Sequence, residues 1–161
     1  MSTLEKRMDR MGLLRAVLRS GTAAGVAMIP FAALFRGLGL RVNEYGRKTL
    51  ELMVGEVASP LRDVLMLGQH LMISWVAALP LLLVLERIEG RRERVLVGAA
   101  YGAGFYVVMN SLALPLAFGD PTPWEIGYIV VLPSLVIHLV FGIVLGLTAP
   151  PAPGLSKWPQ P

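Results

Sequence analysis

The stretch VVLPSLVIHLVFGIVLG, Val130–Gly146, decides the fold class, because it is a nearly unbroken apolar run. A membrane-spanning helix needs about 20 mainly apolar residues to cross a hydrocarbon core of about 30 Å. With its flanks this run meets that requirement, and three earlier segments come close to it. The sequence therefore predicts an all-α membrane protein, a four-transmembrane-helix bundle with spans at about 20–40, 64–85, 95–118 and 126–149.

The composition supports this class and argues against several others. Of the 161 residues 55% are hydrophobic and 16% are charged, whereas about a quarter of the residues in soluble domains are charged. The formal net charge is +4. The basic residues follow the borders of the spans rather than one soluble face with interleaved aromatic residues, so we expect the lipid bilayer, and not a nucleic acid, as the partner. The lack of cysteine excludes disulfides and thiolate metal sites.

Lysine and arginine are distributed unevenly between the segments that join the spans. Residues 1–19 carry five bases and the link ERIEGRRER, residues 86–94, carries four, whereas FGDPTPWE, residues 118–125, carries none. Because such bases concentrate on the cytoplasmic side, we expect both termini to be cytoplasmic. The segment after the first span opposes this rule, since five bases fall on the predicted outer side: Arg36, Arg41, Arg47, Lys48 and Arg62.

The first span is expected to be a retained anchor. It is short between Arg19 and Arg36, although both arginine side chains can extend toward lipid headgroups. A cleaved signal peptide is the alternative, but Met28–Leu38 offers no small-x-small cleavage site.

Two amphipathic segments are expected to lie on the membrane surface. One is an external interfacial helix between spans one and two, at about 44–58, where Leu50, Met53 and Val54 recur at helical spacing beside charged residues. The other is the cytoplasmic N-terminal segment, residues 1–19. Binding to a partner helix is the alternative interpretation of both. The tail, residues 150–161, is rich in proline and is expected to be extended.

The motif TPWE predicts where the fourth span begins. Thr122 is suited to cap a helix, Pro123 to take its first position, and Glu125 to reach back to the amide of the capping residue. We therefore place the start of the fourth span at this motif.

Three pairs of glycines, each four residues apart, predict close contacts between helices. Glycines at this spacing remove side chains from one helix face, so that two backbones can approach each other. Frequent use of glycine in membrane helices is the simpler explanation. With the orientation above, all three pairs fall in the cytoplasmic half of the bundle, and the predicted helix-packing residues are Gly21, Gly25, Gly98, Gly102, Gly142 and Gly146.

Polar side chains are concentrated in the outer half of spans two, three and four. Polar residues inside a membrane generally face the bundle interior or a water-filled cavity. We therefore expect them to meet in one cluster, which is a candidate site for a small ligand. A hydrogen bond between helices that only stabilises the bundle is the competing interpretation, worth about 1 kcal/mol. The candidate residues are His70, Asn110, Ser111, Ser134 and His138.

Haem is the most specific ligand that two intramembrane histidines suggest, because both could serve as axial ligands. Counted from Pro60, His70 lies about 15 Å along span two, whereas His138 lies about 24 Å below Thr122, at about 1.5 Å per residue. This offset argues against one haem between the two imidazoles, so no cofactor is assigned. The spans contain no paired carboxylates, no Ser-His-acid set and no metal-ligand set, and we expect neither catalytic residues nor a metal.

The two halves of the chain show a short internal similarity. GTAAG at Gly21 matches GAAYG at Gly98, and HLMIS at His70 parallels HLVFG at His138 in the following span. Two hairpins of the same orientation would form a parallel repeat, an architecture found in some transporters.

The last two spans also resemble a known group. The stretch NSLALPLAFGDPTPW followed by PSLVIHLVFGIVLG is similar to uncharacterised small bacterial inner-membrane proteins of the YagU-like group, mainly over residues 107–147. The resemblance implies four helices in the bacterial cytoplasmic membrane, and it implies no activity.

Taken together, the sequence favours an integral membrane protein that is not an enzyme. We expect an accessory subunit or a module that binds a small ligand, in a larger membrane complex or a homo-oligomer. The alternative is a small transporter or channel, which the polar outer half and the internal similarity favour. A haem-binding electron-transfer protein is a less favoured alternative.

Overall fold

The computed structural model describes residues 10–42 and 45–150, and helices are the only regular elements in these ranges. Four of the helical stretches, Arg10–Gly37, Ser59–Leu85, Arg91–Phe118 and Ile129–Thr148, are long and apolar enough to cross a membrane. This confirms the predicted all-α class and the predicted number of helices that are long and apolar enough to span a membrane.

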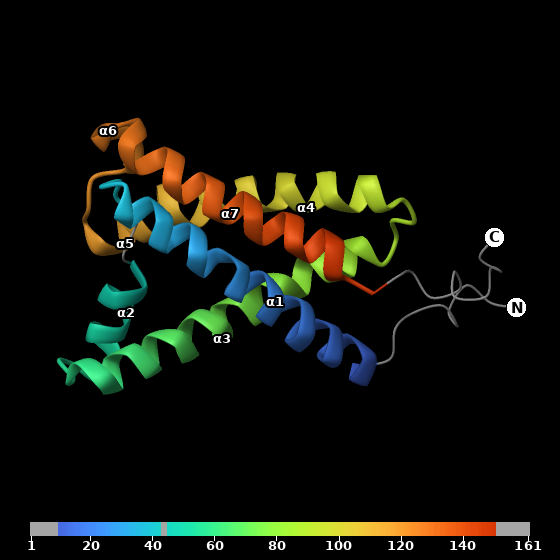
Figure 1. Ribbon diagram of the computed structural model, residues 1–161, viewed down its shortest axis with the longest axis horizontal. Coiled ribbons are helices and arrows are strands. Elements are labelled where there is room, and N and C mark those ends of the chain that lie inside the picture. The colour runs from blue at the N-terminus through green and yellow to red at the C-terminus, as the bar shows by residue number, and fades with distance from the viewer. Residues whose placement is uncertain (1–9, 43–44, 151–161) are drawn as a thin grey trace, which may run out of the picture.

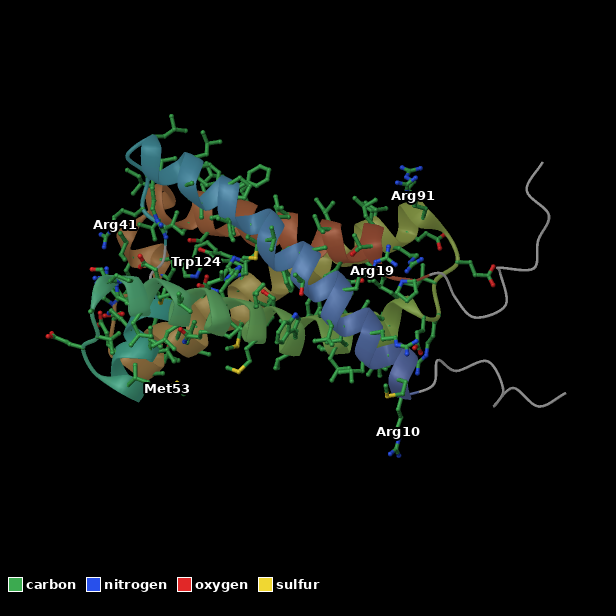
Figure 2. All side chains as sticks on the ribbon, turned by 60° about the horizontal axis from the view of Figure 1, so that its bottom comes forward. Arg10, Arg19, Arg41, Met53, Arg91 and Trp124 are labelled. Atoms are coloured by element: carbon green, nitrogen blue, oxygen red, sulfur yellow. The ribbon has the colours of Figure 1, made fainter. Side chains whose placement is uncertain are left out.

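The chain runs back and forth between two ends of the bundle (Figure 1). Helix α1 (Arg10–Gly37) and helix α4 (Arg91–Phe105) start at the termini end, where α3 (Ser59–Leu85) and α7 (Tyr128–Thr148) finish. The opposite end, called the α2 end, holds the short elements α2 (Tyr45–Val54), α5 (Leu114–Phe118) and α6 (Pro123–Ile126). Figure 2 shows Arg10 and Arg91 at the termini end and Arg41 and Met53 at the α2 end.

The four long helices pack in the order α3, α1, α7, α4. The contact between α4 and α7 is the most extensive, α1 lies between α7 and α3, and α3 touches α4 and α7 only slightly. The core is concentrated toward the termini end, where Ala24, Ala78, Leu82 and Leu145 are almost completely buried. Toward the α2 end, α1 and α3 diverge (Figures 1 and 2).

Several boundaries differ from those predicted. The first span is one continuous helix from Arg10, so the segment 10–19 belongs to the span instead of forming a separate surface helix. Helix α3 begins at Ser59, before the predicted 64, and α2 ends at Val54 because Gly55 takes a left-handed conformation with φ 73°. Residues 1–9 and 151–161, which include most of the predicted N-terminal segment and tail, lie outside the described residues.

The fourth span starts at Tyr128, close to the predicted 126, but the capping motif that was expected to start it belongs to a separate turn. The capping box forms, since the Thr122 amide and hydroxyl donate to the Glu125 carboxylate over 2.6 and 2.8 Å. These hydrogen bonds hold the pKa of Glu125 below its usual value. However, they cap only the single turn α6, because Gly127, with φ 109°, interrupts the helix and α7 starts at Tyr128.

The third span contains a π-helix that the sequence analysis did not predict. Between α4 and α5, residues Tyr106–Ala113 form η2, in which backbone hydrogen bonds join residues five apart. Pro115 lies two residues after the end of η2 and has no backbone N–H, so the regular helical pattern lacks one hydrogen-bond donor at this point. The widened turn sets the position of the polar residues on this span.

Candidate functional site

The candidate site joins η2 to α7 through one imidazole. His138 Nδ1 lies 2.7 Å from the backbone oxygen of Ser134, and His138 Nε2 lies 3.0 Å from Asn110 Nδ2. A carbonyl oxygen only accepts hydrogen bonds, so Nδ1 carries the proton, and Nε2 of the neutral ring accepts from the amide of Asn110. Both ring nitrogens of His138 are therefore engaged.

The π-helix determines which side chains of the third span face inward. Tyr106, Asn110 and Ser111 are buried, whereas Val108 and Leu112 are exposed on the outer side. Since Tyr106 and Ser111 are five residues apart, the wide turn aligns them on the same face. Tyr106 and Ser111 are fully buried, and Asn110 is 9% exposed.

Aromatic rings enclose the imidazole of His138. The ring of Phe105 is stacked on it at a centroid distance of 6.0 Å, and the ring of Tyr106 is tilted against it at 5.6 Å. Trp124 of α6 contacts Tyr106 edge-on at 6.4 Å, on the side of the α2 end. These rings form an apolar wall, which strengthens hydrogen bonds inside the site by excluding water.

Two buried hydroxyl groups on η2 have no hydrogen-bond partner among the described residues. They are the phenol of Tyr106 and the hydroxyl of Ser111, which lie next to each other but do not form a hydrogen bond of normal geometry. Buried polar groups are nearly always satisfied in native proteins, and an exception calls for a bound water, a bound ligand or a functional role. The two hydroxyls are thus buried polar groups whose capacity to form hydrogen bonds with other groups is unused.

The structure brings together most, but not all, of the predicted cluster. Asn110, Ser111, Ser134 and His138 lie around the π-helix, whereas His70, although close enough to His138 for an electrostatic interaction, forms its hydrogen bond with α1. His70 Nε2 is 2.9 Å from the backbone oxygen of Gly25 on α1. The reason is that α3 packs against α1 and hardly touches η2 or α7.

The predicted difference in depth between the two histidines is also wrong. It assumed that the fourth span starts at Thr122, but α7 starts at Tyr128, ten residues before His138. His70 lies eleven residues after the start of α3 at Ser59, so the two residues have similar depths. The hydrogen bonds of both imidazoles, and not an offset, now argue against a shared haem iron. No cluster of three or more metal-ligating side chains occurs within residues 10–42 and 45–150.

All six glycines of the predicted pairs lie where two helices meet. A Cβ atom at Gly98 or Gly142 would overlap the backbone carbonyl of the other, and one at Gly102 would overlap the carbonyl of His138. A Cβ at Gly146 would come within 2.5 Å of the Arg94 carbonyl oxygen. The α4–α7 contact is therefore direct contact between backbones, and it holds the His138 turn against the third span.

The first glycine pair makes a similar but looser contact between α1 and α3. A Cβ at Gly25 would lie 2.6 Å from the Ser74 hydroxyl, and one at Gly21 would lie 3.2 Å from the Ser74 carbonyl. Ser74 occupies the place, four residues after the histidine, that Gly142 occupies in the second half. The serine side chain keeps the first pair of helices farther apart.

The matched sequence segments of the two halves thus occupy equivalent places. The two hairpins are α1 with α3 and α4 with α7. In each hairpin, the second glycine of the first helix lies against the turn that contains the histidine of the second helix: Gly25 lies near His70, and Gly102 lies near His138. The polar side-chain partner of the histidine occurs only in the second half, because Asn110 corresponds to Ala32 or Ala33. The candidate site lies where the two halves differ.

Sequence reasoning missed two features of the site. Tyr106 lies four residues before Asn110, and this helical spacing was a signal that both face the same side. The π-helix had only the indirect signal of Pro115. No protein-family model matches this sequence, and no curated protein and no solved structure matches it.

Proposed function

We propose that this chain is a non-catalytic multi-pass membrane protein that binds a small, uncharged, hydrogen-bonding molecule between its third and fourth spans. The pair of buried hydroxyls without partners, Tyr106 and Ser111, carries the proposal. Leaving them unsatisfied costs about 1–3 kcal/mol each, and a ligand with a donor and an acceptor removes that cost.

The chemistry around the hydroxyls favours a neutral ligand. The cluster consists of a phenol, a hydroxyl, an amide and a neutral imidazole. Burying a charge without a partner of opposite sign is very costly, so an ion would not be stable there. The same groups offer neither an activated nucleophile nor a pair of carboxylates, and we assign no catalytic residue and no cofactor to the site.

The proposed place in the cell combines the charge pattern with the resemblance described above. The termini end carries exposed arginines on α1 and α4, including Arg10, Arg15 and Arg91, so we place it in the cytoplasm. Helix α2 exposes Leu52, Met53 and Val54. We place this helix on the external surface of the same membrane, with these side chains toward the lipid. The YagU-like resemblance favours the bacterial cytoplasmic membrane.

Removal of the Tyr106 hydroxyl distinguishes a ligand site from an empty one. In protein stripped of small molecules by extended detergent washing, Tyr106→Phe should raise the free energy of unfolding by about 1 kcal/mol, because an unsatisfied buried group is lost. In protein isolated gently from membranes, the same change should be neutral or destabilising. Thermal or denaturant unfolding, followed by helix circular dichroism, measures both values.

Mass spectrometry of gently isolated protein then identifies the ligand. The wild type should retain a low-mass molecule that the double variant Tyr106→Phe/Ser111→Ala loses. Ser74→Ala is the matched control, because its hydroxyl already donates to the backbone of His70 over 2.8 Å. An identical set of retained molecules in all three proteins would refute the proposal. A stoichiometric protein partner in that set would favour an accessory subunit instead.

A small transporter is the second candidate, and the equivalence of the two hairpins favours it. Parallel repeats related by an axis along the membrane normal occur in transporters, with the binding site near the midplane. Flux of the retained molecule into proteoliposomes, abolished by Asn110→Ala, would support transport. Binding without flux would leave the chain a binding module.

A further inference from the structure

A second site, independent of the intramembrane cluster, lies at the α2 end. A cavity of about 560 Å³ opens between the end of α1, helix α2 and the start of α7. Ligand sites typically measure about 300–1,000 Å³. Four bases and one acid line the cavity, namely Arg36, Arg41, Arg47, Lys48 and Asp120.

The turn after α1 fixes two of these arginines relative to each other. Arg36 lies in the last turn of α1, and Arg41 follows Gly39, which takes a left-handed conformation with φ 74°. The Gly39 amide donates to the Arg36 carbonyl over 3.0 Å and the Leu40 amide to the Phe35 carbonyl over 2.9 Å. This is the Schellman arrangement that ends a helix with a defined reversal. Arg36 and Arg41 thus reach the cavity from one well-defined turn.

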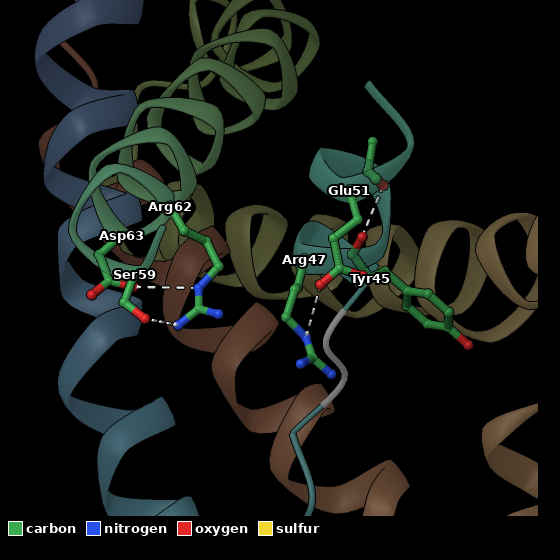
Figure 3. A network of polar contacts seen from close by, with 7 residues as sticks. Tyr45, Arg47, Glu51, Ser59, Arg62 and Asp63 are labelled. Carbon is green, nitrogen blue, oxygen red and sulfur yellow. Dashed lines mark hydrogen bonds and ion pairs between the residues drawn. The ribbon is translucent and has the colours of Figure 1, made fainter. Parts of the chain in front are cut away.

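The other two bases already have anionic partners. Lys48 pairs with Asp120 and lies 5.9 and 5.7 Å from the ring centroids of Tyr45 and Phe118, which stack on each other. Arg47 Nε lies 3.9 Å from Glu51, along α2 (Figure 3). Lys48 therefore ties α2 to the segment after α5 and shapes the cavity wall.

Arg36 and Arg41 form neither an ion pair nor a side-chain hydrogen bond with any residue in 10–42 or 45–150. Tyr45 adds a neutral donor to the lining, since burial and the nearby Asp120 carboxylate raise its pKa above the usual value. The lining also includes the apolar side chains of Ile126 and Val130. The cavity thus combines positive charge with an apolar wall.

The cavity also lies at the level where the spans end. It is bounded by the last turn of α1 and the first turn of α7, where Arg36 and Val130 are located. In the rest of the chain, lysine and arginine concentrate on the proposed cytoplasmic side, whereas these bases lie on the opposite side. Departures from a general sequence rule are expected at functional sites.

We propose that this cavity binds a phosphate group, with Arg36 and Arg41 as its principal ligands. The planar guanidinium group presents paired N–H donors that match phosphate oxygens, and it keeps its charge at any physiological pH. The apolar wall would contact whatever the phosphate is attached to. An anionic lipid headgroup and free inorganic phosphate share this chemistry, and two experimental arms distinguish them.

The lipid arm uses the full chain in nanodiscs that contain phosphatidylglycerol and phosphatidylcholine in equal amounts. Lipids that stay bound after detergent extraction are counted by native mass spectrometry. Arg36→Gln/Arg41→Gln should lower the affinity for phosphatidylglycerol by about tenfold for each arginine, the usual effect of losing one charge-assisted contact. Arg62→Gln is the matched control, because Arg62 is at the same end but is held by Ser59 and Asp63 outside this cavity (Figure 3).

The second arm titrates inorganic phosphate at constant ionic strength and follows the melting temperature in a zwitterionic detergent. Phosphate-dependent stabilisation of the wild type and of Arg62→Gln, but not of the double variant, would identify free phosphate as the ligand. Selective loss of phosphatidylglycerol in the double variant would identify the lipid. Helix circular dichroism and size-exclusion chromatography confirm that each variant is folded. If folded double variant, control and wild type behave alike in both arms, the proposal is wrong.

Discussion

Replacing Gly142 by alanine should separate α4 from α7 and leave little correctly folded protein. A Cβ at this position would overlap the carbonyl of Gly98 and lie 3.0 Å from the amide nitrogen of Gly102. Both obstacles are backbone atoms, so no side-chain rotation relieves the overlap. Overpacking in a core costs about 1–3 kcal/mol. We expect a loss at the upper end of that range or beyond, since a whole helix must move.

Gly104→Ala is the matched control for this substitution. Gly104 lies on α4 near Gly102, and a Cβ there would meet no atom within 4 Å. Alanine is favoured over glycine inside a helix by about 1 kcal/mol, so this variant should be as stable as the wild type or slightly more stable. Yield in the membrane and thermal unfolding in detergent measure both changes. Equal stability of the two variants would contradict the close α4–α7 contact.

Replacing Arg94 by methionine should destabilise the termini end by about 2–3 kcal/mol. Arg94 is only 8% exposed, and its Nη2 donates to the carbonyls of Ala149 and Pro150 over 2.6 and 2.7 Å. These carbonyls lie at the end of α7, where a positive charge also interacts favourably with the helix dipole. Methionine keeps the apolar volume of the side chain but removes the charge and both hydrogen bonds.

Arg92→Met, at an exposed position of the same helix, provides the comparison for Arg94. It should change the free energy of unfolding by less than about 0.5 kcal/mol, as most surface substitutions do. Chemical unfolding in detergent, followed by tryptophan fluorescence, resolves this difference. If the two substitutions had equal effects, the role of Arg94 in capping α7 would be excluded.

The number of spans could be predicted from sequence because it depends on local properties. Apolar length and the position of bases are visible in a single segment, and they indicated the four long helices. The start of α7 could not be predicted in the same way. The capping box at Thr122 is a valid local signal, but the helix it starts ends after one turn at Gly127.

The composition of the candidate site was harder to predict than the number of spans, because it depends on which helices become neighbours. Glycine spacing indicated close contacts, yet only the fold pairs Gly98 with Gly142 and Gly25 with the Ser74 turn. His70 was expected to join the His138 cluster, but its helix packs on α1, and its imidazole forms a hydrogen bond with the Gly25 carbonyl. The π-helix that turns Tyr106 and Ser111 inward departs from the regular helical spacing on which sequence analysis relies. Which helices become neighbours is decided by the tertiary fold, and the residue pattern within a single span does not encode it.

Nitrogen-15 NMR of the labelled protein in lipid tests most directly whether a neutral His138 is fixed between Asn110 and Ser134. His138→Gln assigns the signals of this ring. The hydrogen bonds predict a protonated Nδ1 and an unprotonated Nε2. In Asn110→Leu, the Nε2 resonance should shift because its donor is lost, while Nδ1 stays bonded to the Ser134 carbonyl. A protonated Nε2, or an Nε2 signal that does not respond to Asn110→Leu, would contradict the proposed arrangement.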